Sequence, residues 1–155
     1  MMDSFRIKGP CRLEGSVKIS GAKNAMLPLM AATISTGGPR RLENVPDLRD
    51  TRTMMKLLDV LGIASGLEDG TLSVDASKVT GFEAPYDLVR TMRASIYALG
   101  PLLARFGRAR VSMPGGCAWG PRPVNLHLQG LMSMGADIRI DHGYIDARAD
   151  RLRGA

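Results

Sequence analysis

Residues 61–74 read Leu61-Gly62-Ile63-Ala64-Ser65-Gly66-Leu67-Glu68-Asp69-Gly70-Thr71-Leu72-Ser73-Val74. The Asp69-Gly70 pair, between two runs with apolar side chains, predicts a β-hairpin with a two-residue turn. A similar pattern returns at residues 134–146, where Met134-Gly135 replaces Leu61-Gly62 and His142-Gly143 replaces the turn. A pattern that recurs after about 70 residues indicates an internal structural repeat.

The order of elements around each hairpin is also repeated. A strand, a helix, a second strand and a second helix precede the hairpin, so the expected fold class is α/β, built from repeats. Helices are expected over residues 25–34, about 50–61, 91–106 and 124–134. Strands are expected over residues 5–7, 17–19, 41–45, 63–67, 71–74, 110–113, 136–140 and 144–146.

Two such units are few for a repeat architecture. Each unit buries its helices against its neighbours, and about three or more units are usually needed for a stable core. Residues 149–155 continue from the second hairpin without a clear cap. We therefore expect this chain to be a fragment, or the product of a truncated reading frame, of a longer protein, and self-association could supply the missing neighbours.

The composition fits a globular domain and excludes some functions. Of the 155 residues, 45% are hydrophobic and 23% are charged, which is ordinary for such a domain. The net charge of +6 fits nucleic acid, a small anionic substrate or a solvated surface. Because no Lys/Arg block with interleaved aromatic residues is present, nucleic acid is the weakest alternative. No membrane partner is expected, since no stretch has the length of a membrane helix.

The two cysteines, Cys11 and Cys117, lack the spacing of a metal site. The first residues also lack the apolar run of a signal peptide. We expect no metal, no disulfide framework and a reducing, cytoplasmic location.

Two cations stand at expected helix starts. In Ser20-Gly21-Ala22-Lys23-Asn24, a glycine precedes the start and Lys23 lies in the first turn. The positive end of the helix dipole opposes this cation unless an anion lies between them. Arg93 has nearly the same place in the second repeat, so both side chains could face one cleft. The alternatives are a solvated lysine and a surface arginine.

Residues 113–127 contain three glycines and three prolines, which predict a loop with an unusual backbone conformation. They read Met113-Pro114-Gly115-Gly116-Cys117-Ala118-Trp119-Gly120-Pro121-Arg122-Pro123-Val124-Asn125-Leu126-His127. A loop cysteine near Arg122 is a candidate for a reactive thiol, whereas free cysteines are more usually small buried hydrophobes. Arg122 could hold a phosphate through two parallel hydrogen bonds. His127 fits a structural or a catalytic role.

Five motifs resemble those of the enolpyruvyl transferases that act on UDP-N-acetylglucosamine, the UDP-N-acetylglucosamine 1-carboxyvinyltransferase family. They occupy residues 20–25, 84–89, 91–95, 114–117 and 122–127, so the resemblance covers essentially the whole chain. The sister family of the shikimate pathway is similar but has lysine-serine where this chain has Lys23-Asn24.

The resemblance implies an inside-out α/β barrel made of βαβαββ units, with two domains of three units each and the active site between them. This chain would hold a partial barrel of about two units. Residues 1–20 would be strands that cross between the domains. Residues 21–155 would be a partial domain with repeats at about 21–80 and 81–150.

The resemblance also implies a reaction and its residues. The enolpyruvyl group of phosphoenolpyruvate would pass to the 3-hydroxyl of UDP-N-acetylglucosamine in peptidoglycan precursor synthesis, without a cofactor. Lys23 and Cys117 would be catalytic, and Cys117 would be the residue that fosfomycin alkylates. The implied substrate-binding residues are Lys23, Asn24, Arg93, Arg122, Pro123, Val124, Asn125, Leu126 and His127.

Three positions depart from the family pattern. Asn125 stands where aspartate is usual, Trp119 where a smaller aliphatic residue is expected, and Pro121 where alanine is common. A non-catalytic fragment or a diverged paralogue that binds without turnover is the alternative function.

Overall fold

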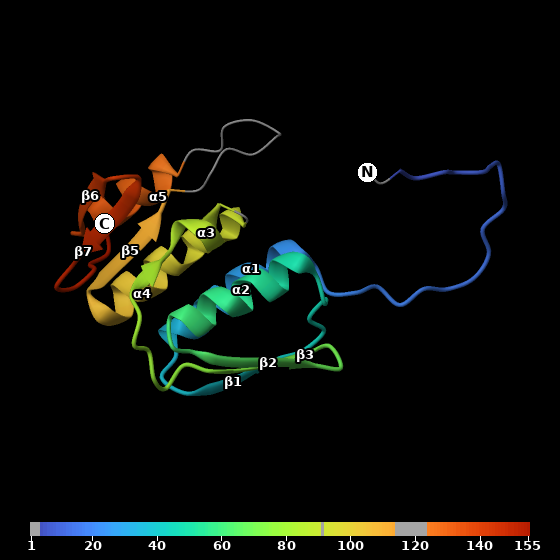
Figure 1. Ribbon diagram of the computed structural model, residues 1–155, viewed down its shortest axis with the longest axis horizontal. Helices are drawn as coiled ribbons and strands as arrows, with labels where there is room; N and C mark the ends of the chain where they lie inside the picture. The colour runs from blue at the N-terminus through green and yellow to red at the C-terminus, as the bar shows by residue number, and fades with distance from the viewer. Residues whose placement is uncertain (1–3, 91, 114–123) are drawn as a thin grey trace.

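The computed structural model describes residues 4–90, 92–113 and 124–155. Figure 1 shows two small β-sheets with helices packed between them. The fold is therefore mixed α/β, as the sequence predicted. Closure into an inside-out barrel stays a prediction.

The first unit contains β1 (Pro39–Leu42), α2 (Arg49–Val60), β2 (Ala64–Glu68) and β3 (Thr71–Asp75). The second unit contains β5 (Arg108–Ser112), α5 (Asn125–Ser133), β6 (Asp137–Asp141) and β7 (Tyr144–Arg148). Each unit forms an antiparallel sheet with its last strand in the middle, in the orders β1-β3-β2 and β5-β7-β6. The second sheet has one more strand, β4 (Glu83–Ala84), which runs parallel to β5.

The register of the two sheets is also equivalent. Leu42 pairs with Leu72 in the first sheet, and Val111 pairs with Ile145 in the second. Both turns have positive φ at their two central residues, 46° and 71° at Asp69-Gly70 and 47° and 78° at His142-Gly143. These angles are those of type I′ turns, so both predicted hairpins are confirmed. The division into repeats at about 21–80 and 81–150 stays a prediction.

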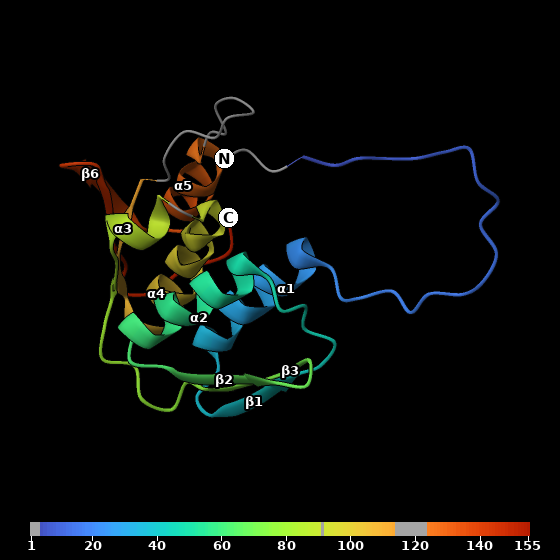
Figure 2. The ribbon, with the colours of Figure 1, turned by 45° about the vertical axis from the view of Figure 1, so that its right-hand side comes forward.

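The helices of the first unit cover one face of its sheet. The helix α1 (Lys23–Ala32) continues into the 3₁₀ helix η1 (Thr33–Ser35) and lies beside α2 over β1, β2 and β3 (Figures 1 and 2). Strand residues Leu72 and Val74 are buried beneath them, with helix residues Met30, Met54 and Leu57. Burial of these apolar side chains provides the main driving force for the fold.

One predicted helix is divided. Residues 91–106 were expected to form a single helix, but the structure has the 3₁₀ helix η2 (Arg93–Ala98) followed by α4 (Leu99–Phe106). A short helix, α3 (Tyr86–Val89), precedes them. The Ser95 hydroxyl donates a hydrogen bond to the carbonyl oxygen of Met92 at 2.6 Å, and the Ser95 amide bonds the same oxygen at 3.1 Å. These i→i+3 bonds favour the tighter 3₁₀ turn. Gly107, at φ 69°, ends α4 as predicted.

The strands predicted at residues 5–7 and 17–19 are not formed in this structure. Residues 4–22 contain no strand and extend away from the helices and sheets (Figures 1 and 2). Phe5 is 98% exposed and Ile19 is 77% exposed. Two short strands alone cannot bury such side chains, so the pairing prediction was wrong for this chain. The assignment of residues 1–20 as crossing strands between two domains stays a prediction.

Arg105 of α4 is hydrogen-bonded to the first unit and the segments next to it. Arg105 Nη1 donates hydrogen bonds to the carbonyl oxygens of Ile34, Thr36 and Ala76 at 2.8, 2.8 and 2.9 Å. Its guanidinium also lies 4.7 Å from the centre of the Phe106 ring.

The helices of the described residues are all too short or too polar to span a membrane.

Candidate active site

A pocket of about 200 Å³ lies where four helical segments begin. The first residues of α1 and α2 border it, as do the start of η2 and the residue that precedes α5. Its described lining residues are Lys23, Asn24, Leu27, Asp50, Met92, Arg93, Ala94, Ile96, Tyr97, Val124 and His127. Five of them, namely Lys23, Asn24, Arg93, Val124 and His127, were predicted as site residues.

Glycine fixes the entry to α1. A β-carbon on Gly21 would overlap the carbonyl oxygen of Asn44 and would lie 3.2 Å from Cδ of Pro46. The chain before α1 therefore packs directly against the segment that leads into α2. This contact sets where Lys23, the first residue of α1, projects relative to the α2 start.

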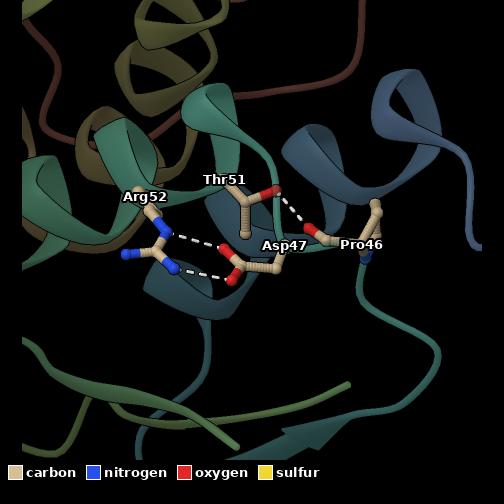
Figure 3. A network of polar contacts seen from close by, with 4 residues as sticks. All are labelled: Pro46, Asp47, Thr51 and Arg52. Carbon is tan, nitrogen blue, oxygen red and sulfur yellow. Dashed lines mark hydrogen bonds and ion pairs between the residues drawn. The ribbon is translucent and has the colours of Figure 1, made fainter. Parts of the chain in front are cut away.

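The start of α2 is held by side-chain hydrogen bonds (Figure 3). The Thr51 hydroxyl donates to the carbonyl oxygen of Pro46 at 2.8 Å. Arg52 donates to both carboxylate oxygens of Asp47, at 2.7 Å from Nε and 2.6 Å from Nη2. The Arg52 hydrogen bond lowers the pKa of the Asp47 carboxyl below its usual value, and Asp47 correspondingly raises the pKa of Arg52.

Asp50 brings a carboxylate into the pocket from the first turn of α2. Its Oδ2 lies 3.0 Å from Nζ of Lys23, and the side chains are 30% and 47% exposed respectively. Carboxylates are favoured near a helix N-terminus. Lys23 is therefore paired with a carboxylate of the protein itself, a contact that the sequence did not predict.

Arg93 contributes the second cationic side chain. It is the first residue of η2 and is half-buried in the lining of the pocket. The two hydrogen bonds from Ser95 to Met92 fix the turn that carries it. The structure therefore brings Lys23 and Arg93 to one pocket, as the repeat predicted.

The predicted residues after position 123 divide between two surfaces. Val124 and His127 face the pocket. Leu126 instead lines an adjoining apolar groove with Tyr97, and it is 73% exposed. Asn125 is exposed at the first position of α5. Cys117, Arg122 and Pro123 lie outside the described residues.

The arrangement is suited to a small anion. Helix N-termini concentrate unpaired backbone N–H groups and partial positive charge, and here the starts of α1, α2, η2 and α5 meet. Lys23 and Arg93 add positive charge, and Asp50 removes part of it. Among the described residues, no group of three His, Cys, Asp or Glu side chains could hold a metal.

A larger hollow, about 490 Å³, lies along β5 and β7 and contains no predicted site residue. Its arginines interact with neighbouring side chains. Arg110 pairs with Glu83 at 3.1 Å, and the Arg108 guanidinium lies 3.9 Å from the centre of the Phe82 ring. These contacts explain why the arginines lie on this surface without assigning them a ligand.

Among the lining residues that were not predicted as site residues, Asp50 and Tyr97 carry polar groups. Asp50 was visible in the sequence as an acidic residue at an expected helix start, which is also common for purely structural reasons. Tyr97 fell within a predicted helix, where its spacing carried no functional signal. Only the packing of three helical segments reveals that both border the site.

Comparison with known proteins adds the family context. The family model of EPSP synthase (3-phosphoshikimate 1-carboxyvinyltransferase) matches residues 7–155. A protein of Hydrogenovibrio crunogenus named UDP-N-acetylglucosamine 1-carboxyvinyltransferase is 55% identical over 155 residues, which are 99% of this chain and 37% of that protein. The chain thus spans little more than a third of this relative's length.

Two solved structures share the fold. The enolpyruvyl transferase NikO from Streptomyces tendae is similar with a TM-score of 0.77 and 31% identity, over 91% of this chain and 31% of that chain. EPSP synthase from Acinetobacter baumannii has a TM-score of 0.60 and 15% identity, over 91% of this chain and 33% of that chain. The second likeness concerns the fold alone.

Proposed function

The chain belongs to the EPSP synthase family, and from this premise we propose that the full-length protein is an enolpyruvyl transferase acting on UDP-N-acetylglucosamine. The enolpyruvyl group of phosphoenolpyruvate passes to the 3-hydroxyl of the sugar, and phosphate is released. The observation that carries this proposal is the gathering of Lys23, Asn24 and Arg93 at one pocket. The 55% identity to a protein named for this reaction supports UDP-N-acetylglucosamine over a shikimate acceptor.

The proposed chemistry is an addition followed by an elimination. The sugar hydroxyl oxygen bonds to C2 of phosphoenolpyruvate and gives its proton to a general base of the full-length protein, while the methylene carbon of phosphoenolpyruvate gains a proton from the general acid. The C2–O bond to phosphate then breaks, a methyl proton is lost, and the enol ether remains. In this proposal Cys117 acts as the general acid at the methylene carbon.

Positive charge is the main requirement at the phosphate end. Lys23 and Arg122 hold the phosphate of phosphoenolpyruvate in this proposal, and Arg93 lines the same cleft. Placing such groups where negative charge accumulates stabilises the transition state of the reaction. The four helix starts around the pocket add partial charges of the same sign.

The sugar nucleotide would occupy the neighbouring surface. Asn24 orients it, and its uridine part is contacted by Arg122, Pro123, Asn125, Leu126 and His127. Val124 is a further substrate-binding residue. The positions of Val124 and His127 in the pocket lining support this proposal. The accompanying biological role is peptidoglycan precursor synthesis in the cytoplasm, and Cys117 is the expected target of fosfomycin.

The test measures phosphate release from phosphoenolpyruvate by the full-length protein, with and without UDP-N-acetylglucosamine. Turnover should require the sugar nucleotide and should fall about 100-fold or more in Lys23→Gln, the scale for loss of one charge-stabilising donor. Cys117→Ala should abolish turnover, whereas Cys117→Asp, which keeps an acid, should retain it. Unchanged turnover in Cys117→Ala would contradict the proton-donor role.

A second candidate function applies to the 155-residue chain by itself. Because it spans 37% of its relative's length, the chain alone would be a non-catalytic fragment. The departures from the family pattern at Trp119, Pro121 and Asn125 would instead fit a diverged paralogue that binds ligand without turnover. Its exposed Leu29 and Leu126 side chains would favour self-association. We expect no phosphate release from the purified chain and a mass above that of the monomer in sedimentation. A measurable rate would exclude this candidate.

A further inference from the structure

The pair formed by Lys23 and Asp50 carries an inference about how the site works. Lys23 is the first residue of α1, where the dipole of its own helix opposes its positive charge. A flexible lysine in such a position, with about four rotatable bonds, would by itself populate many conformations. The Asp50 carboxylate, 3.0 Å from Nζ, selects one of them.

The position of Asp50 is itself strongly determined. The Thr51 hydroxyl bonds to Pro46, and the next residue along α2, Arg52, bonds twice to Asp47 (Figure 3). The backbone amide of Arg52 also donates to the carbonyl oxygen of Leu48 at 3.0 Å. The turn that carries Asp50 is therefore fixed on both sides, and its side chain has a defined origin.

The two residues are also fixed relative to each other. Gly21 packs against Asn44 and Pro46, so the chain that enters α1 touches the segment that enters α2. Lys23 and Asp50 therefore face each other across the pocket from two supports in direct contact. The helix start favours a carboxylate at position 50, but the partly exposed ion pair with Lys23 adds little further stability. The main consequence of the pair is therefore the position that it gives to the ammonium.

We propose that Asp50 is a positioning residue that holds the Lys23 ammonium at one point of the pocket before the anionic substrate binds. The kinetic part of this inference rests on the proposed function. Asp50 has two opposite effects on a bound anion. It orients the cation, which favours reaction, and it repels the anion, which weakens binding. Removing the carboxylate should therefore lower kcat much more than it changes the affinity for phosphate.

The experiment compares full-length wild type with Asp50→Asn. We expect kcat to fall about 10- to 100-fold, as for a misplaced catalytic group, while the Kd for inorganic phosphate changes less than about threefold because the two effects offset each other. Asp59→Asn is the matched control. It removes a charge from the exposed far end of α2, roughly 13 Å along the helix, and should leave both quantities unchanged. An unchanged kcat in Asp50→Asn would overturn the proposal.

A readout that does not depend on turnover separates this inference from the proposed function. Amine-specific labelling of Lys23, followed by peptide mass spectrometry, should be about two- to fivefold faster in Asp50→Asn, the range for a partly exposed ion pair. The exposed Lys56 serves as the internal reference. Equal Lys23 labelling in wild type and Asp50→Asn would overturn the inference. If the wild type shows no turnover but Lys23 is labelled faster in Asp50→Asn than in the wild type, the proposed reaction is rejected and the positioning role is supported.

Asp50→Glu covers the case in which Asp50→Asn folds poorly. This variant keeps the carboxylate, so Lys23 labelling should stay slow. The side chain is longer by one methylene, which displaces the ammonium, and kcat should fall to a value between wild type and Asp50→Asn. A wild-type kcat in Asp50→Glu with slow labelling would show that the position of the ammonium is unimportant and would overturn the proposal.

Discussion

The α-carbon of Gly21 lies so close to Asn44 that a β-carbon added there would overlap the Asn44 carbonyl oxygen. The atom in the way is backbone, so it cannot rotate aside as a flexible side chain would. Asn44 is itself constrained, with a φ of 55°. The contact therefore acts as a spacer between the starts of α1 and α2.

Gly21→Ala should separate these helix starts. Because backbone must move, we expect a loss of about 1–3 kcal/mol in the free energy of unfolding, the usual cost of overpacking. The affinity of the full-length protein for inorganic phosphate should fall as well, since Lys23 follows two residues later. Thermal unfolding and calorimetric titration measure the two effects. Gly38→Ala, where an added β-carbon meets nothing within 4 Å, is the control.

The elements that were predicted correctly depend on local chemistry. Both hairpins follow from Asp69-Gly70 and His142-Gly143, whose positive φ values are set by the turn itself. The strand at 17–19 had suitable composition, but a strand needs a partner, and composition does not provide one. The α-helix expected from residue 91 failed at Ser95, where a side-chain hydrogen bond to Met92 favours a 3₁₀ turn.

The site was predictable only in part, because some of its contacts depend on how distant segments pack rather than on local chemistry. Lys23 and Arg93 were predicted from the family motifs, and the repeat, which relates two helix starts along the chain, indicated that they could share one cleft. Asp50 belongs to a third helix start, and its distance from Lys23 depends on how α1 and α2 pack. Such a relation between two helices leaves no periodic signal in a single sequence.

Asp47→Asn should reveal how much the Asp47–Arg52 pair contributes to the stability of the fold at each pH. The folded-state pKa of Asp47 is lowered from 3.8 by the Arg52 hydrogen bond, so its stabilising contribution is present above that ordinary value. It is lost as the pH falls through the folded-state pKa. The Tm difference between wild type and variant should be constant from pH 7 to pH 5 and should shrink below about pH 4. A difference that grows on acidification would contradict this assignment.

Arg105→Leu should destabilise the contact between the two units. The carbonyl oxygens of Ile34, Thr36 and Ala76 would lose their donor, and partly buried acceptors without partners cost about 1–3 kcal/mol in all. The Tm of the full-length protein should fall by several degrees. Arg139→Leu removes an arginine that is paired at 3.1 Å with Asp137 on an exposed strand, and it should change the Tm much less.

Gly143→Ala isolates the backbone requirement of the second hairpin. An added β-carbon would meet nothing within 4 Å, so packing does not oppose the substitution, but φ is 78°. The left-handed conformation costs a residue with a β-carbon about 1–2 kcal/mol, and the Tm should fall accordingly. Gly130→Ala is the matched control, because its β-carbon also enters open space but within the helix α5. Alanine is favoured there by about 1 kcal/mol, so the same substitution should raise the Tm. A fall of similar size in both variants would show that the left-handed turn conformation is not the cause of the loss at position 143.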